Sequence, residues 1–211
     1  MLELFLSAFA TLFVVIDPPG CAPIYGGLTQ DASSAQRRSM AIRAVVIAAA
    51  VLLGFALFGE ELLEALHIEL DSFRMAGGIM LFIIAAEMVF EKRTQRREER
   101  AEKFRAEHAE TIEVEDVSVF PMAMPMLAGP GAIATIMLLV GEADGVEATL
   151  VVLAALALVM ALTLAALLAA GPLIRLLGSS VESAITRLLG VLLAALAAQY
   201  VVDGIRGAFG V

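Results

Sequence analysis

Between Ala148 and Ile174 the chain contains no charged residue. A helix needs roughly 20 consecutive apolar residues to cross a membrane, and this run is longer than that. Hydrophobic residues make up 60% of the 211 positions, whereas soluble domains have about 45–50% apolar residues. The chain is therefore predicted to be an all-α integral membrane protein. Its six expected transmembrane helices are residues 4–28, 40–59, 73–90, 117–140, 148–174 and 185–202.

The first expected span is interrupted close to its middle. Residues 13–29 contain three prolines, which cannot donate backbone hydrogen bonds, and Gly20, which tolerates conformations that other residues avoid. Opened backbone inside hydrocarbon survives only where it is buried in protein or lines a water-filled cavity. Asp17 also favours a cavity, because an ionisable residue within a span usually marks an ion, proton or substrate path. The alternative interpretation is a plain kinked helix with a buried, neutral Asp17.

The sequence contains an internal repeat. Pro19-Gly20 recurs as Pro130-Gly131, and Arg74-x-x-Gly77 recurs as Arg187-x-x-Gly190 at nearly the same offset. Each half has three spans, an odd number, so the second copy must enter the membrane in the opposite direction. The prediction is two inverted three-helix repeats with helices 1 and 4 broken at their Pro/Gly motifs.

The predicted domain organisation follows from this repeat. Residues 1–91 form the first repeat, residues 117–211 form the second, and residues 92–116 form a charged cytoplasmic linker. Because runs of mixed charge usually face water, the linker is interpreted as a solvated spacer.

The two breaks are expected to meet near the membrane midplane, as the N-termini of half-helices running from Cys21 and Ala132. Helix N-termini attract anions, so this junction would suit a carboxylate. Asp17 would hold an ammonium group or a coupling proton, and Glu87 would relay protons or pair with a basic residue of the linker. The surrounding Gly and Ala residues leave room only for a small ligand. The candidate substrate-binding residues are Asp17, Pro19, Gly20, Cys21, Pro23, Gly129, Pro130, Gly131 and Thr135.

The basic residues predict the orientation. Twelve of the fourteen Lys and Arg residues lie on one side of the predicted membrane, chiefly in the linker. By the positive-inside rule that side is cytoplasmic, which places both termini outside the cytoplasm.

Four motifs resemble the MarC family of six-span inner-membrane proteins over nearly the whole chain. They are Asp17-Pro18-x-Gly20-x-x-Pro23, Phe73-Arg74-Met75-x-Gly77-Gly78, Pro125-x-x-x-Gly129-Pro130-Gly131 and Gln199-Tyr200-x-x-x-Gly204-Ile205. The family includes small neutral amino acid transporters of the SnatA type and is related to the LysE exporter superfamily. The resemblance implies proton-linked transport of glycine, alanine and similar molecules across a bacterial inner membrane. The chain departs from the family pattern at Cys21, where Asn is usual, and at Ala134, where Thr is common.

The expected partners are a small-molecule substrate, protons and the lipid bilayer. The net charge of −9 comes mostly from loops and does not indicate nucleic-acid binding. No nucleotide-binding loop, catalytic triad or zinc motif occurs, so neither an enzyme nor a bound metal or cofactor is expected. Two alternatives to an amino acid transporter stay open: an exporter of a cation or other small metabolite, as in the LysE superfamily, and a membrane stress protein that transports nothing.

Overall fold

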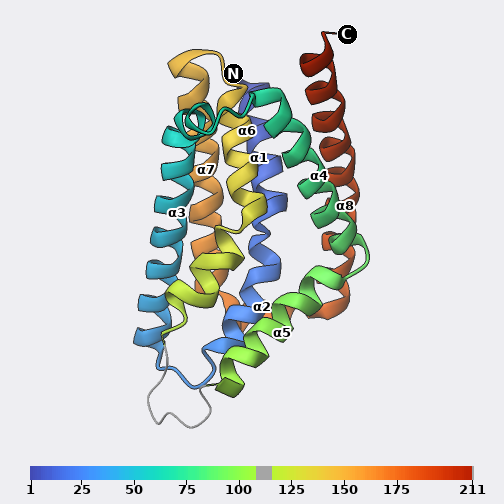
Figure 1. Cartoon of the computed structure of the whole chain (residues 1–211). Coiled ribbons are helices and arrows are strands. Elements are labelled where there is room, and N and C mark those ends of the chain that lie inside the picture. The colour runs from blue at the N-terminus through green and yellow to red at the C-terminus, as the bar shows by residue number, and fades with distance from the viewer. Residues whose placement is uncertain (108–115, 211) are drawn as a thin grey trace.

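The computed structural model describes residues 1–107 and 116–210, and the regular elements within those ranges are all helical (Figure 1). The first half of the chain contains α1 (Leu2–Ile16), α2 (Pro18–Leu28), α3 (Ser34–Ala65) and α4 (Leu70–Val89), and the charged α5 (Lys92–Glu107) follows it. The second half contains η1 (Ser118–Leu127), α6 (Pro130–Gly141), α7 (Gly145–Leu168) and α8 (Ala170–Phe209). Residues 108–115 of the expected linker lie outside the described part of the chain.

The helices of the described residues are long and apolar enough to cross a membrane five times. Four of these spans are α3, α4, α7 and the C-terminal part of α8, and α1 with α2 forms the remaining one. The pair η1 and α6, bent by 54° between its two parts, provides a sixth when it is counted as one broken span. The predicted all-α, six-span membrane architecture is confirmed.

The two halves run in opposite directions. In Figure 1 the chain descends through α1 and α2, whereas it rises through η1 and α6; both termini lie at the end of the bundle away from α5. Corresponding elements of the two halves also make corresponding contacts. The contact between α4 and α6 matches that between α8 and α2, and the contact between α1 and α7 matches that between η1 and α3. Such matching contacts are what two inverted copies of one three-span unit produce.

Equivalent helices α4 and α8 pack against each other along a seam of small residues. A Cβ atom added to Gly78 would lie 2.8 Å from the carbonyl oxygen of Ala197, and one added to Gly204 would lie 2.8 Å from that of Asp71. The absence of side chains at these positions lets the two backbones approach closely, as is common between membrane helices. The pair α4–α8 therefore forms one wall beside the broken helices.

Three of the helix boundaries that differ from the predicted ones lie at or close to a proline. The half-helices begin at Pro18 and Pro130, earlier than Cys21 and Ala132, because proline suits the first helical position, where no N–H partner is needed. The predicted separation of the spans 148–174 and 185–202 is wrong, because α8 begins at Ala170 and is helical through residues 175–184. Pro172 falls in the first turn of α8, which proline tolerates, so it marks a helix start within the predicted fifth span.

Candidate functional site

Asp17 alone separates α1 from α2. Its backbone is left-handed, with φ 59° and ψ 64°, a conformation that Asp adopts more readily than most residues. Its Oδ1 accepts a hydrogen bond from the Gly20 amide at 3.2 Å, so Asp17 caps the N-terminus of α2. The first break is thus a one-residue turn whose carboxylate accepts a hydrogen bond from one of the free backbone N–H groups at the start of α2.

The Asp17 carboxylate also pairs with Arg97 of α5. Arg97 Nη1 donates to Asp17 Oδ2 at 2.8 Å, and Nη2 donates to the carbonyl oxygen of Ile16 at 3.4 Å. The side chains of Arg97 and Asp17 are only 7% and 4% exposed. A charge buried this deeply is strongly unfavourable alone and tolerable when it is paired and hydrogen-bonded. The pair therefore fixes α5 against the first break.

Burial disfavours the charge on Arg97, but the nearby Cys21 sulfur and Asp17 carboxylate outweigh that effect and raise the pKa of Arg97. Arginine is protonated at any physiological pH in the first place, so this guanidinium is a permanent cation inside the protein. The interpretation of residues 92–116 as a spacer that only faces water is wrong for Arg97.

The second break lies beside the first. Gly129 is the N-cap of α6, and a Cβ atom at Gly131 would lie 3.7 Å from Cγ1 of Val15, in the last turn of α1. The amides of Gly131 and Ala132 belong to the first turn of α6 and have no intrahelical acceptor. No side chain of the described residues caps this helix. The N-terminus of α6 is thus open to a ligand, whereas that of α2 is capped by Asp17.

A cavity of about 140 Å³ lies between this open helix end, α4 and α5. Its lining from α5 is basic, with Arg96, Arg97 and Arg100, and its lining from α4 includes Glu87, which forms an ion pair with Arg96. The remaining lining residues are Val15, Ile84, Pro125, Met126, Leu127, Gly129, Pro130, Gly131 and Ala132. The cavity thus combines a helix N-terminus with three arginines and one carboxylate.

The structure brings some of the predicted site residues together at this cavity and places others behind it. Gly129, Pro130, Gly131 and Glu87 line it, and Asp17 joins it through Arg97. Gly20 supports Asp17 from the first turn of α2. Pro19 and Pro23 are half-buried within α2, which continues past Pro23 without ending.

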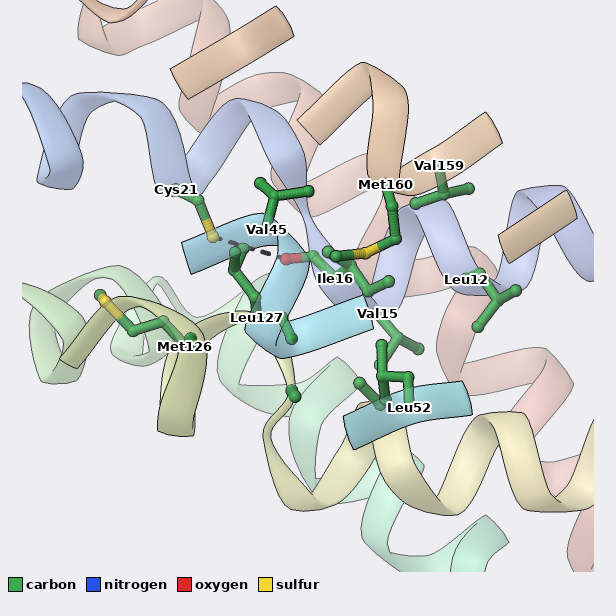
Figure 2. Close-up of a cluster of buried hydrophobic side chains, with 14 of the residues drawn as sticks. Leu12, Val15, Ile16, Cys21, Val45, Leu52, Met126, Leu127, Val159 and Met160 are labelled. Carbon is green, nitrogen blue, oxygen red and sulfur yellow. Dashed lines mark hydrogen bonds between the residues drawn. The ribbon is translucent and has the colours of Figure 1, made fainter. Parts of the chain in front are cut away.

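Cys21 and Thr135 are buried and bond to their own segments. The Cys21 thiol donates to the carbonyl oxygen of Ile16 at 3.5 Å, and the Thr135 hydroxyl donates to that of Gly131 at 2.7 Å. Figure 2 shows Cys21 and Ile16 in a packed cluster with Leu127 of η1 and Met160 of α7. Both residues lie close to the breaks, where their polar atoms satisfy backbone carbonyls.

Arg97 is a candidate site residue that the sequence reasoning missed. Its helix is mostly charged, and only the apolar residues Ala101 and Phe104, at helical spacing from Arg97, mark the face on which it lies. One further signal was available: a carboxylate within a span needs a partner, and the densest group of cations in the sequence is in α5.

Polar contacts also join α4 to the end of α6 on the side of the two termini. Arg74 of α4 donates to Glu142 at 2.9 Å and to Asp71 at 2.8 Å. Gln199 and Asp203 of α8 hydrogen-bond to each other at 2.9 Å. The bundle therefore has ion pairs on both sides of the broken helices, with α5 supplying those at the cavity.

Within the described residues, no group of three or more His, Cys, Asp and Glu side chains is placed to hold a metal ion. The arginine-rich lining of the cavity would also repel a cation, because like charges at short range are unfavourable.

These features define a multi-pass membrane protein with two interrupted helices and a small polar cavity, which lies at the second break between α4, α5 and α6. Residues 2–209 match the MarC family of integral membrane proteins, and the chain belongs to this family. A UPF0056 membrane protein of Methanocaldococcus jannaschii is 36% identical over 207 residues, which cover 98% of each chain. The UPF0056 inner membrane protein YhgN of Escherichia coli is 32% identical over 201 residues, 95% of each chain. No solved structure gives a significant match.

Proposed function

We propose that this protein is a secondary transporter of small neutral amino acids of the glycine and alanine type, coupled to protons. The observation that carries the proposal is the meeting of two oppositely directed broken helices at a small polar cavity. In transporters built from inverted repeats, discontinuous helices place substrate groups at such a junction, and the two halves exchange conformations around it.

The size and chemistry of the cavity support a small ligand with a carboxylate. Engineered cavities of about 150 Å³ hold a molecule as large as benzene; this one, at about 140 Å³, is of similar size. The open first turn of α6 and the arginines of α5 favour an anionic group, because helix N-termini and guanidinium groups both donate hydrogen bonds to carboxylates.

Two acids are the proposed carriers of the coupled proton. Asp17 and Glu87 pair with the adjacent residues Arg97 and Arg96 of one helix. Protonation of Asp17 would remove a charge that holds α5 against the first break, and protonation of Glu87 would remove one that holds α5 against α4. The proposed site of proton coupling is therefore the contact between α5 and the cavity.

The proposed orientation places α5 in the cytoplasm and both termini on the opposite side of a plasma membrane, which is the inner membrane in Gram-negative bacteria. It rests on the concentration of Lys and Arg in α5 and on the position of both termini at the other end of the bundle (Figure 1).

Counterflow in proteoliposomes tests the function without assuming a direction of transport. Vesicles loaded with unlabelled glycine or alanine are diluted into a trace of the labelled compound, and label is expected to accumulate transiently. Asp17→Asn should abolish this accumulation, while Asp31→Asn, at an exposed position after α2, should leave it unchanged. The proposal is wrong if folded wild-type protein gives no counterflow above empty vesicles across a panel of small neutral amino acids.

Coupling is tested in the same vesicles with a pH gradient. Uphill uptake should depend on the gradient and disappear with a protonophore. Glu87→Gln should lose gradient-driven uptake and retain counterflow if Glu87 carries the proton. Uptake that ignores the gradient would contradict proton coupling while leaving the transport proposal intact.

A further inference from the structure

The buried pair of Arg97 and Asp17 offers both charges that a zwitterion needs. Its guanidinium and carboxylate are 2.8 Å apart and nearly inaccessible to solvent. Arg97 lines the cavity, so one member of the pair already faces the space available to a ligand. Gly131 and Ala132, whose amides belong to the first turn of α6, line the same space.

Charge balance restricts what can replace this contact. A cation bound to Asp17 would leave Arg97 as an unpaired buried charge, and an anion bound to Arg97 would leave Asp17 unpaired. A ligand that pairs with only one member of a buried ion pair leaves the charge of the other member uncompensated, which is strongly unfavourable. A molecule that carries an ammonium and a carboxylate satisfies both partners and leaves the net charge of the site unchanged.

We propose that the substrate inserts between Arg97 and Asp17, with its carboxylate on Arg97 and the first-turn amides of α6 and its ammonium group on Asp17. The inference rests on the proposed transport function and assigns its binding site. Arg97 then has two successive partners. In the empty protein it neutralises Asp17, and in the loaded protein it holds the carboxylate.

This assignment gives α5 a direct part in binding. Because Arg97 leaves Asp17 when substrate enters, α5 changes its contact with α2 on every binding event. It also separates the roles of the two acids: Asp17 binds the ammonium group, and Glu87, paired with Arg96 at the same cavity, is left to carry the proton.

The geometry limits the size of the substrate side chain. The cavity has a volume of about 140 Å³ in all, so the ammonium and carboxylate groups of a substrate leave little of it for a side chain. Glycine and alanine are expected to fit better than leucine or phenylalanine.

Binding to the purified full chain in detergent tests the insertion directly. Thermal stability is measured with glycine, with methylamine, with acetate, and with methylamine and acetate together. Glycine should raise the melting temperature, whereas methylamine or acetate alone should not. If acetate or methylamine alone stabilises the protein as much as glycine does, or if glycine has no effect, the proposal is overturned.

Substitutions at Arg97 supply the second measurement. Arg97→Gln should weaken glycine binding by about tenfold or more, because hydrogen bonds to charged groups contribute about 1.5–3 kcal/mol. Arg97→Lys should restore part of the affinity. Lys103→Gln removes the same charge from an exposed position on α5 and should change nothing. Unchanged glycine affinity in Arg97→Gln would overturn the assignment.

Two further results keep this test decisive. The double variant Asp17→Asn/Arg97→Gln has no buried charge, so it should fold even if Arg97→Gln does not, and it should fail to bind glycine. Glycine binding by this double variant would contradict the inference.

Failure of the transport function is distinguishable, because wild-type protein would then bind glycine without counterflow. Counterflow with an unchanged KM in Arg97→Gln would instead reject the site and leave the function standing.

Discussion

Gly20 leaves free the space that the carboxylate of Asp17 occupies. A Cβ atom at residue 20 would lie 2.3 Å from Oδ2 of Asp17, the same oxygen that accepts the hydrogen bond from Arg97. A side chain at this position therefore cannot coexist with the observed ion pair.

Gly20→Ala is accordingly expected to displace Asp17 and break its contact with Arg97. Separating a buried ion pair costs on the order of 3 kcal/mol, so the free energy of unfolding should fall by about that amount. Gly27→Ala is the matched control, since it lies in the same helix with no atom within 4 Å of the added Cβ. Unfolding in detergent by SDS titration measures both variants, and equal stability of the two would contradict this account of Gly20.

A double-mutant cycle on Asp17 and Arg97 should reveal strong coupling. Asp17→Asn and Arg97→Gln each leave an unpaired buried charge, and each is expected to reduce the free energy of unfolding by about 3–5 kcal/mol. The double variant should lose much less than the sum of the two. Additive losses, measured by the same SDS titration, would mean that the two side chains do not interact in the folded protein.

Acid should weaken the attachment of η1 to α3. Burial disfavours the charge on Asp116, but a hydrogen bond from the Ser118 amide at 3.0 Å and the Arg43 guanidinium 2.6 Å away outweigh it and hold the pKa of Asp116 below its ordinary value. A lowered native pKa stabilises the fold above about pH 4 and loses that contribution as the pH falls through the native pKa.

Asp116→Asn should therefore make the melting temperature less sensitive to pH below about pH 4. The effect will be small, because both side chains of the ion pair are largely exposed. Thermal melts of wild type, Asp116→Asn and the exposed-site control Asp31→Asn across the acid range provide the measurement. Parallel curves for all three proteins would show that Asp116 does not contribute to the pH dependence of the melting temperature.

The sequence identified the two breaks because Pro and Gly at Pro19-Gly20 and Pro130-Gly131 are incompatible with an ordinary membrane helix. It did not reveal which groups meet there. The contact between Asp17 and Arg97 spans eighty residues, and no local pattern encodes such a distance. The capping of α2 by Asp17 was also missed, because it depends on the left-handed backbone at that residue.

The error at the start of α8 has a different origin. The apolar run through Ile174 predicts one span, although Gly171 and Pro172 fall within it. Apolar composition continues across this junction, so hydropathy does not mark it. The proline does, because it fits the first turn of a new helix better than the interior of an old one.

The orientation across the membrane is open to a direct experiment. Single cysteines at Leu2 and Lys103, each in a Cys21→Ser background, should react with a membrane-impermeant maleimide from opposite sides of intact cells and inverted vesicles. Labelling of residue 103 from the cytoplasmic side and of residue 2 from outside is expected from the distribution of basic residues. The reverse pattern would contradict the proposed orientation.

The most direct test of the account is an experimental structure of the protein with glycine bound. Density for glycine is expected between the Arg97 guanidinium and the Asp17 carboxylate, with its carboxylate facing the amides of Gly131 and Ala132. The 2.8 Å contact between Arg97 and Asp17 should be open in that structure. Glycine bound elsewhere, with this ion pair intact and the cavity at the two breaks empty, would contradict the central claim.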